Sequence, residues 1–192
     1  NVTVDGLKVR NNGGNYTGGA FGKGVATNVS VIGHGDPRAK NEEDRNYVIG
    51  KSNVGGIYGT SQGHSNFSYS TAENLYIRGN YGNYVGGVAG LSGGNSYAIS
   101  RNNNIYSTCG MVGGLYGRTY NAMKYQYVIG VTINGCYSVG GITGYNASTM
   151  EYSQVGPLKD AEGNTLQHTT INARGHTVGG IAGYQGAATV RY

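Results

Sequence analysis

One six-residue pattern recurs along this chain and constrains its fold more than any other feature. Its clearest copy reads Val-Gly-Gly-Leu-Tyr-Gly, at residues 112–117. A pattern that returns at intervals of a few dozen residues is the signature of a repeat architecture, in which each unit stacks on the next. The six copies begin at Thr17, Val54, Val85, Val112, Val139 and Val178, with spacings of 37, 31, 27, 27 and 39 residues.

The spacing inside the pattern predicts a corner in the chain. Two apolar residues three positions apart would face opposite sides of a regular strand. Glycine reaches backbone angles closed to other residues, so a corner at the glycine pair can turn both apolar residues toward one interior. We therefore expect the fourth position to face a core and the fifth to face outward. The structural glycines are Gly55, Gly56, Gly86, Gly87, Gly113, Gly114, Gly140, Gly141, Gly179 and Gly180.

Composition supports a fold made of strands. The 37 glycines among 192 residues argue against a helical protein, and no window shows sustained helical periodicity. Short β-rich runs at 26–32, 47–50 and 127–130 lead toward copies of the motif. We predict an all-β fold, a parallel β-helix or β-solenoid of about six coils, with residues 1–192 forming a single repeat array.

Two charged windows interrupt this regularity. Residues 33–46 and 150–168 lie in the two longest repeat units and contain the two prolines, Pro37 and Pro157. A stack of coils tolerates insertions in its loops because they leave the pairing of neighbouring coils intact. We predict that both windows are loop insertions.

Charge is distributed unevenly around these windows. The formal net charge is +5, but the chain outside the two windows carries ten basic and two acidic side chains. A basic body attracts polyanions such as an acidic glycan, although solubility alone also accounts for such an excess. We do not expect nucleic acid as a partner.

The repeated Val-Gly-Gly-Ile/Leu-x-Gly pattern, preceded by Gly/Asn-rich β runs, resembles the GLUG repeat. This repeat occurs in bacterial surface and secreted proteins, including IgA1-specific zinc metalloproteases and adhesin-like proteins. The resemblance covers nearly the whole chain, and the first copy departs from it at Thr17 and Ala20. It implies a bacterial, extracellular, non-catalytic module.

The sequence offers no catalytic, cofactor or metal site. None of the four histidines is followed by glutamate, so the His-Glu-x-x-His zinc motif of a metalloprotease is missing from this segment. The acidic run Glu42-Glu43-Asp44 fits no calcium-loop spacing and is interpreted as a solvated loop. We expect the chain not to be an enzyme, although its parent protein can be one.

Aromatic and basic side chains mark a candidate binding surface. Interleaved along one wall, they would suit an acidic glycan or a protein, whereas stacked rings can also simply support the ladder. The candidate ligand-binding residues are Phe21, Tyr58 and Tyr116 at the fifth motif position, and Lys23, Arg118, Tyr145 and Tyr184 two residues further on.

The two cysteines provide a test of the stacking. Cys109 and Cys136 each lie three residues before a motif valine and are 27 residues apart, so they should be neighbours on adjacent coils. Parallel strands lie within the reach of a disulfide, but parallel side-chain directions make its geometry awkward. We favour two packed thiols over a bridge.

Three hypotheses for function follow. The first is a rigid spacer or recognition module of an extracellular or cell-surface bacterial protein that contacts host glycoprotein or acidic glycan. The second is an accessory segment of an IgA1-protease-like metalloenzyme whose catalytic site lies outside this chain, and the third is a self-stacking filament subunit. No run of residues is long and apolar enough to span a membrane. Both ends of the sequence stop in strand-like residues, and the end coil of a solenoid needs a cap. We therefore expect flanking domains of a longer parent chain as partners.

Overall fold

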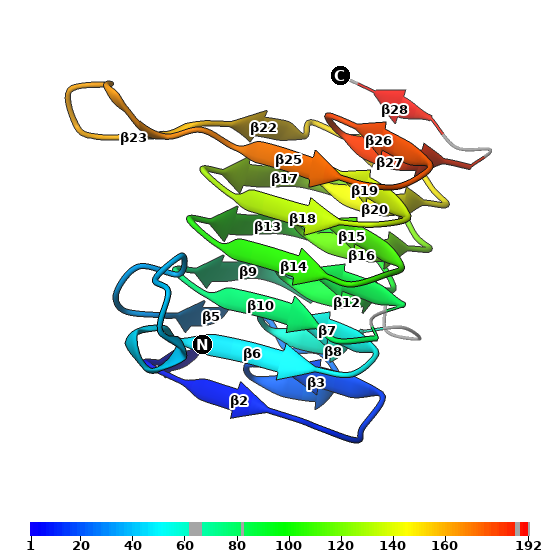
Figure 1. Ribbon diagram of the computed structural model, residues 1–192. Helices are drawn as coiled ribbons and strands as arrows, with labels where there is room; N and C mark the ends of the chain where they lie inside the picture. Colours follow the sequence, from blue (N-terminus) through cyan, green and yellow to red (C-terminus); the bar gives the residue numbers. More distant parts are fainter. Residues whose placement is uncertain (62–66, 82, 187–188, 192) are drawn as a thin grey trace.

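The chain winds into six stacked coils, and each of the first five coils contributes one strand to each of four parallel sheets (Figure 1). This computed structural model describes residues 1–61, 67–81, 83–186 and 189–191. All pairs between coils are parallel and follow the order of the sequence. The predicted β-solenoid is confirmed.

Each coil runs through the sheets in the order A, B, C, D. Sheet A contains β1 (Val2–Asp5), β5 (Val29–Ile32), β9 (Phe67–Glu73), β13 (Asn95–Arg101), β17 (Met123–Ile129), β21 (Met150–Glu151) and β28 (Val190–Arg191), with β22 (Gln154–Gly156) also paired to β17. Sheet B contains β2 (Lys8–Arg10), β6 (Tyr47–Gly50), β10 (Tyr76–Gly79), β14 (Asn104–Ser107), β18 (Thr132–Gly135) and β25 (Thr170–Ala173).

Sheets C and D are formed by the repeated motif. Sheet C contains β3 (Tyr16–Gly18), β7 (Asn53–Gly55), β11 (Tyr84–Gly86), β15 (Met111–Gly113), β19 (Ser138–Gly140) and β26 (Thr177–Gly179). Sheet D contains β4 (Phe21–Lys23), β8 (Tyr58–Thr60), β12 (Ala89–Ser92), β16 (Tyr116–Thr119), β20 (Thr143–Asn146) and β27 (Ala182–Gln185).

Equivalent motif residues stack directly on one another. Gly86 of β11 pairs in register with Gly55 on one side and Gly113 on the other, and the valines before them pair likewise. Val112 and Leu115, the first and fourth residues of the same motif, are both fully buried. The prediction that both apolar positions face one interior is therefore correct in the middle coils.

The glycines serve a different purpose from the one expected. None of the motif glycines has a positive φ, so the corner does not require a left-handed backbone. A Cβ on Gly117 would lie inside van der Waals distance of the Val85 backbone nitrogen and 2.6 Å from the Tyr84 carbonyl carbon, in sheet C of the coil before. Glycine is required because sheets C and D approach each other backbone to backbone.

This close approach makes sheet D an inner layer. One face of β16 meets sheet C through Gly117, while Tyr116 on the same strand donates a hydrogen bond from its hydroxyl to Oε1 of Gln126 in β17, 2.8 Å away. Sheet D therefore lies between sheets C and A. The fifth motif position points toward sheet A, and the expectation that it faces outward is wrong for four copies, in which Tyr58, Ala89, Tyr116 and Thr143 are fully buried.

The first predicted insertion is a loop that also forms hydrogen bonds with later coils. Residues 33–46 leave the stack between β5 and β6 and include a short 3₁₀ turn, Glu42–Asp44. Arg38 reaches across to later coils, donating to Oδ1 of Asn102 at 2.8 Å, the carbonyl of Gly130 at 3.0 Å and Oγ1 of Thr132 at 3.1 Å. The loop of the second coil is thus bonded to the fourth and fifth.

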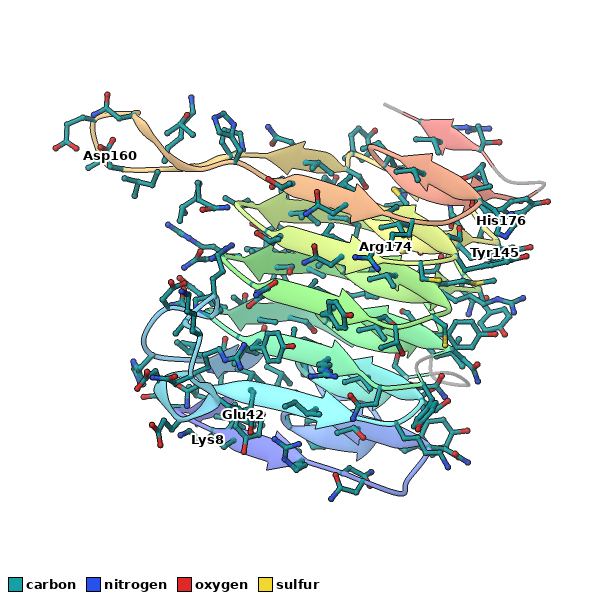
Figure 2. The ribbon with its side chains drawn as sticks, viewed as in Figure 1. Lys8, Glu42, Tyr145, Asp160, Arg174 and His176 are labelled. Carbon is teal, nitrogen blue, oxygen red and sulfur yellow. The ribbon has the colours of Figure 1, made fainter. Side chains whose placement is uncertain are left out.

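The second insertion is shorter than predicted. Residues 150–156 supply β21 and β22, which pair with β17 in sheet A because their apolar residues continue the pattern of that sheet. Beyond them, β23 (Leu158–Lys159) and β24 (Thr165–Gln167) form an antiparallel hairpin that projects from the stack (Figure 1), with Asp160 near its tip (Figure 2). Only this hairpin, and not the whole of 150–168, behaves as an insertion.

The close packing of the motif predicts a position-dependent effect of alanine. A Cβ on Gly114 would overlap the carbonyl oxygen of Gly141 and lie 2.7 Å from Cγ1 of Val128, whereas the equivalent Gly180 has nothing within 4 Å. We expect Gly114→Ala to lower the free energy of unfolding by about 3 kcal/mol through overpacking, and Gly180→Ala to change it little. Urea unfolding of both variants measures the difference, and equal effects would contradict the packing argument.

Candidate functional site

The candidate residues at the fifth motif position do not form an outer wall. Tyr58 and Tyr116 are fully buried, and Phe21, half-buried in the first coil, stacks on Tyr58 with ring centroids 5.7 Å apart. The hydroxyl of Tyr58 donates to the carbonyl of Ala26 at 2.9 Å. These three side chains are core residues, and the prediction that they form an exposed binding column is wrong.

The column two residues further on does share one line of the stack. Lys23 pairs with Thr60 at one end of it, and Arg118, Tyr145 and Tyr184 are paired in register at the other. Lys23 and Tyr184 are exposed, whereas Arg118 and Tyr145 are half-buried. The structure thus brings three of the four predicted residues together and leaves Lys23 apart from them.

Tyrosines surround the guanidinium of Arg118. Its Cζ lies 4.5 Å from the ring centre of Tyr120 and 4.7 Å from that of Tyr145, and its Nη1 donates to the hydroxyl of Tyr84 at 3.2 Å. Tyr145 in turn stacks on Tyr184 with centroids 5.0 Å apart. Cation–π contacts of this kind hold the arginine in place. The cluster lies at the edge of the stack where Figure 2 labels Tyr145.

A second aromatic surface, on sheet A, is more regular. Tyr69, Tyr97, Tyr125 and Tyr152 follow one another on consecutive coils, with ring centroids 5.2, 6.5 and 5.2 Å apart. All four are exposed, by 58, 36, 43 and 51% respectively. We call these four residues the tyrosine ladder. Their spacing of 28, 28 and 27 residues is visible in the sequence, so the repeat period could have revealed them.

Every tyrosine of the ladder has a left-handed backbone. Their φ values are 58, 86, 56 and 51°, a region that bulky residues rarely adopt. In β17 the left-handed residue reverses the alternation of the strand, so that Lys124 and Tyr125 both face outward while Met123 and Gln126 face inward. The first half of the strand can therefore cover Tyr116 of sheet D, and the second half turns its side chains to the main core.

The charges beside the ladder are balanced. Nζ of Lys124 lies 2.9 Å from Oε2 of Glu151, and Nε of Arg101 lies 3.6 Å from Oε1 of Glu73. These pairs lie on sheet A, as the ladder does. The ladder therefore presents aromatic rings and hydroxyl groups on a surface of low net charge.

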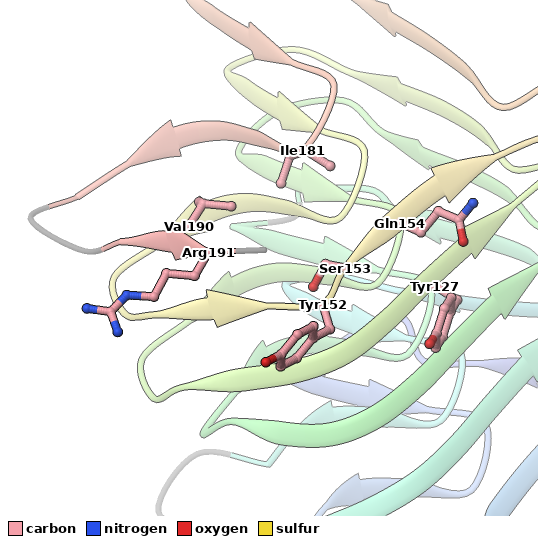
Figure 3. A pocket seen from close by; sticks show the side chains of 7 residues that line it. All are labelled: Tyr127, Tyr152, Ser153, Gln154, Ile181, Val190 and Arg191. Atoms are coloured by element: carbon pink, nitrogen blue, oxygen red, sulfur yellow. The ribbon is translucent and has the colours of Figure 1, made fainter.

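The ladder borders a hollow in its last coil. The hollow measures about 670 Å³ and is shown in Figure 3. It is lined by Tyr127, Tyr152, Ser153, Gln154, Ile181, Val190 and Arg191.

The two cysteines occupy equivalent positions on adjacent coils. Met111 and Ser138, each two residues after a cysteine, are paired in register. No disulfide joins Cys109 to Cys136, both of which the structure describes. Cys109 is exposed and Cys136 is half-buried, and the preference for two packed thiols stays a prediction.

The described part of the chain contains no cluster of three or more histidine, cysteine, aspartate or glutamate side chains arranged to hold a metal ion. Nor is any helix in it long and apolar enough to cross a membrane. Comparison with family models, with curated proteins and with solved structures gives no match for this chain.

Burial of Tyr116 predicts a loss of stability in alkali. Burial raises the pKa of this phenol in the folded state, whereas a tyrosine of the unfolded chain titrates near pH 10. The folded protein thus keeps a proton that the unfolded chain releases, so this stabilisation is complete below about pH 10 and is lost as the pH rises toward the folded pKa. The free energy of unfolding should fall by about 1 kcal/mol per pH unit above pH 10 through this group.

Urea unfolding at several alkaline pH values measures this slope. We expect Tyr116→Phe to remove that part of it. Tyr125→Phe, a change in the exposed ladder, serves as the control and should leave the slope as it is. The same slope in the wild type and in Tyr116→Phe would contradict the assignment.

Proposed function

We propose that this chain is a non-catalytic recognition module of an extracellular bacterial protein, and that the tyrosine ladder is its contact surface. On this proposal the solenoid is the rigid support, and the GLUG-like repeats supply it. The expected partner is an extended chain, such as the glycan-bearing segment of a host glycoprotein. The single observation that carries the proposal is the strained backbone of four exposed tyrosines in line.

The energetics of the ladder support a role outside the fold. A left-handed backbone costs a residue with a Cβ about 1–2 kcal/mol, and the ladder contains four such residues. The four aromatic contacts of the ladder, which include that of Tyr97 with Tyr127, return about 0.5–1.5 kcal/mol each. At the middle of these ranges the contacts return about 4 kcal/mol against a strain of about 6 kcal/mol, so ring contacts within the fold do not account for tyrosine at these positions.

The chain itself shows the less costly solution. Asn28 occupies the ladder position on the second coil with φ of 56°, and Asn74 and Asn102 adopt the same conformation at corners of later coils. Asparagine tolerates this region better than other side chains. Asparagine would fit this backbone conformation better than tyrosine. The presence of four tyrosines instead indicates that their rings are used in binding.

The geometry of the ladder suits an extended partner. Tyrosine rings combine apolar area with a hydroxyl group and lose little conformational entropy on binding, which favours them in recognition surfaces. Successive rings follow the spacing of the coils, so a linear chain lying along the stack would meet one ring per coil. The balanced charges nearby favour a neutral partner.

Asparagine substitutions in the ladder test this proposal. We expect the double variant Tyr97→Asn/Tyr125→Asn to keep the fold, because the relief of backbone strain offsets the lost ring contacts. Its affinity for an immobilised mucin-type glycoprotein, from which sialic acid has been removed, should fall by at least tenfold. Biolayer interferometry measures the binding, and circular dichroism measures the melting temperature.

Tyr81→Asn is the matched control. Tyr81 is 71% exposed and lies outside sheet A, so its loss should leave the affinity unchanged. If the wild type does not bind the mucin, or if the ladder and control variants bind it equally well, the proposal fails.

A further inference from the structure

Three arginines gather on the outer face of sheet B, on a different surface from the ladder. Arg10 lies in β2 and Arg78 in β10, in one line of the register with Ile49 of β6 between them. Arg45 follows the 3₁₀ turn of the first insertion, two residues before β6 begins. Sheet order and the insertion thus bring together three cations that are 33 to 68 residues apart in the sequence.

Each of these arginines rests on a tyrosine of the same sheet. The Cζ atom lies 5.4 Å from the ring centre of Tyr47 for Arg10, 4.1 Å from that of Tyr76 for Arg45, and 5.5 Å from that of Tyr106 for Arg78.. Contact with a ring engages the flat face of a guanidinium and leaves the N–H groups at its edge to donate in its own plane. The ring contacts of Tyr76 and Tyr106 therefore hold Arg45 and Arg78 through their flat faces, whereas Tyr47 also accepts a hydrogen bond from Arg10.

The positive charge of this cluster exceeds its negative charge. Arg10 forms an ion pair with Glu42, but the structure gives Arg45 and Arg78 no ion pair with any residue it describes. The Nε atoms of both are buried without a hydrogen-bond partner among the described residues. A buried donor left in this state destabilises the fold, and neither guanidinium has all its donors satisfied within the described part of the chain.

All three arginines act on the single carboxylate of Glu42. The hydrogen bond from Arg10 lowers the pKa of Glu42 most, and the positive charges of Arg10, Arg45 and Arg78 lower it further. With Lys8 and the neighbouring Glu43 and Asp44 included, four cations meet three carboxylates here, which leaves a surplus of one positive charge. Glu42 therefore occupies part of a site that has room for further negative charge.

A hollow adjoins the cluster. It measures about 460 Å³ and is lined by Lys8, Asn41, Glu42, Glu43 and Tyr47. Nζ of Lys8 donates to the backbone carbonyl of Glu43 at 2.6 Å, which fastens the insertion to β2. Figure 2 shows Lys8 and Glu42 close together over β2 and β6.

We propose that this face binds the sulfate or carboxylate groups of an acidic polysaccharide, with Arg45 and Arg78 as the principal donors and Glu42 as a built-in competitor for Arg10. Guanidinium groups bind such anions through paired, charge-assisted hydrogen bonds. Arg10 and Arg78 are two coils apart, roughly 10 Å at the spacing of parallel strands, which is close to the length of a disaccharide unit. The site goes beyond the ladder and does not depend on it.

The surroundings favour a polysaccharide over a nucleic acid. Single-stranded nucleic acids are held largely by stacking of bases on open aromatic faces. Here Tyr76 is only 8% exposed beneath Arg45, and Tyr106, which is 38% exposed, has Arg78 over its ring. Beyond Tyr106 on the same face, amides of Asn104, Asn134 and Asn172 form a hydrogen-bonded row with links of 3.5 and 3.0 Å, which suits sugar hydroxyls.

Heparin, a sulfated polysaccharide, is the probe for this site. We expect Arg45→Gln/Arg78→Gln to lower heparin affinity by at least tenfold, measured by fluorescence titration and by the salt concentration that elutes the protein from immobilised heparin. The control, Arg101→Gln/Lys124→Gln, removes the same charge from sheet A and should lower the affinity by less than threefold. Equal losses would show that only net charge matters and would overturn the proposal.

The competitor role of Glu42 gives a test that misfolding cannot imitate. We expect Glu42→Gln to raise heparin affinity several-fold, because it frees Arg10, and Glu43→Gln to have a smaller effect although it removes the same charge. No gain from Glu42→Gln over Glu43→Gln would contradict this role.

Two further measurements separate the possible sources of the anion. We expect inorganic sulfate at millimolar concentration to compete weakly with heparin, since one ion cannot engage several arginines as a polymer does. Displacement of heparin by sulfate at equimolar anion concentration, or tighter binding of a single-stranded DNA oligonucleotide that depends on Arg45 and Arg78, would overturn the assignment to a polysaccharide. Failure here leaves the neutral-mucin test of the ladder intact.

Discussion

Direct contact between the backbones of sheets C and D is the constraint on which this structure depends. Because glycines and small side chains such as Ser138, whose hydroxyl donates to the Gly144 carbonyl at 2.7 Å, lie between these two layers, the chain can fold an arch of two strands inside each coil and still bury apolar residues on its outer sides. Val112 and Leu115 fill the space toward sheets A and B, and Tyr116 fills the space toward the first half of β17. The glycine motif thus sets the short distance between sheets C and D, and it does so in every coil.

The same inner arch determines which side chains are available for recognition. It withdraws Tyr58 and Tyr116 into the core and leaves sheets A and B as the broad outer faces. The two faces differ in electrostatics: the acidic and basic side chains in the strands of sheet A balance in number around an aromatic ladder, whereas sheet B carries arginines in excess of their carboxylates. One rod can therefore offer a neutral and a cationic surface to different parts of a partner.

Much of the fold follows from the sequence, because identical motifs at a coil period have few ways to stack. The register of Gly55, Gly86 and Gly113 was predictable for this reason. The direction of Tyr116 was not, because simple alternation after the glycine pair assumes one sheet facing one solvent, and here a further layer covers that strand. Tyr152 lay in a window predicted to be a loop, so the period of the ladder was overlooked. The arginine cluster was not predictable either. Its members come from an insertion and from two strands that are far apart in the sequence, so no local sequence pattern indicates that they lie close together.

Arg38 gives the first insertion a mechanical consequence. A rod held together coil by coil would peel under a pulling force one turn at a time, since each turn contacts only its neighbours. Arg38 bonds the loop of the second coil to Asn102 in the fourth and to Gly130 in the fifth, and Asn104 bonds back to the carbonyl of Pro37. These coils share the load, so the middle of the rod resists shear as one block while its two ends yield first.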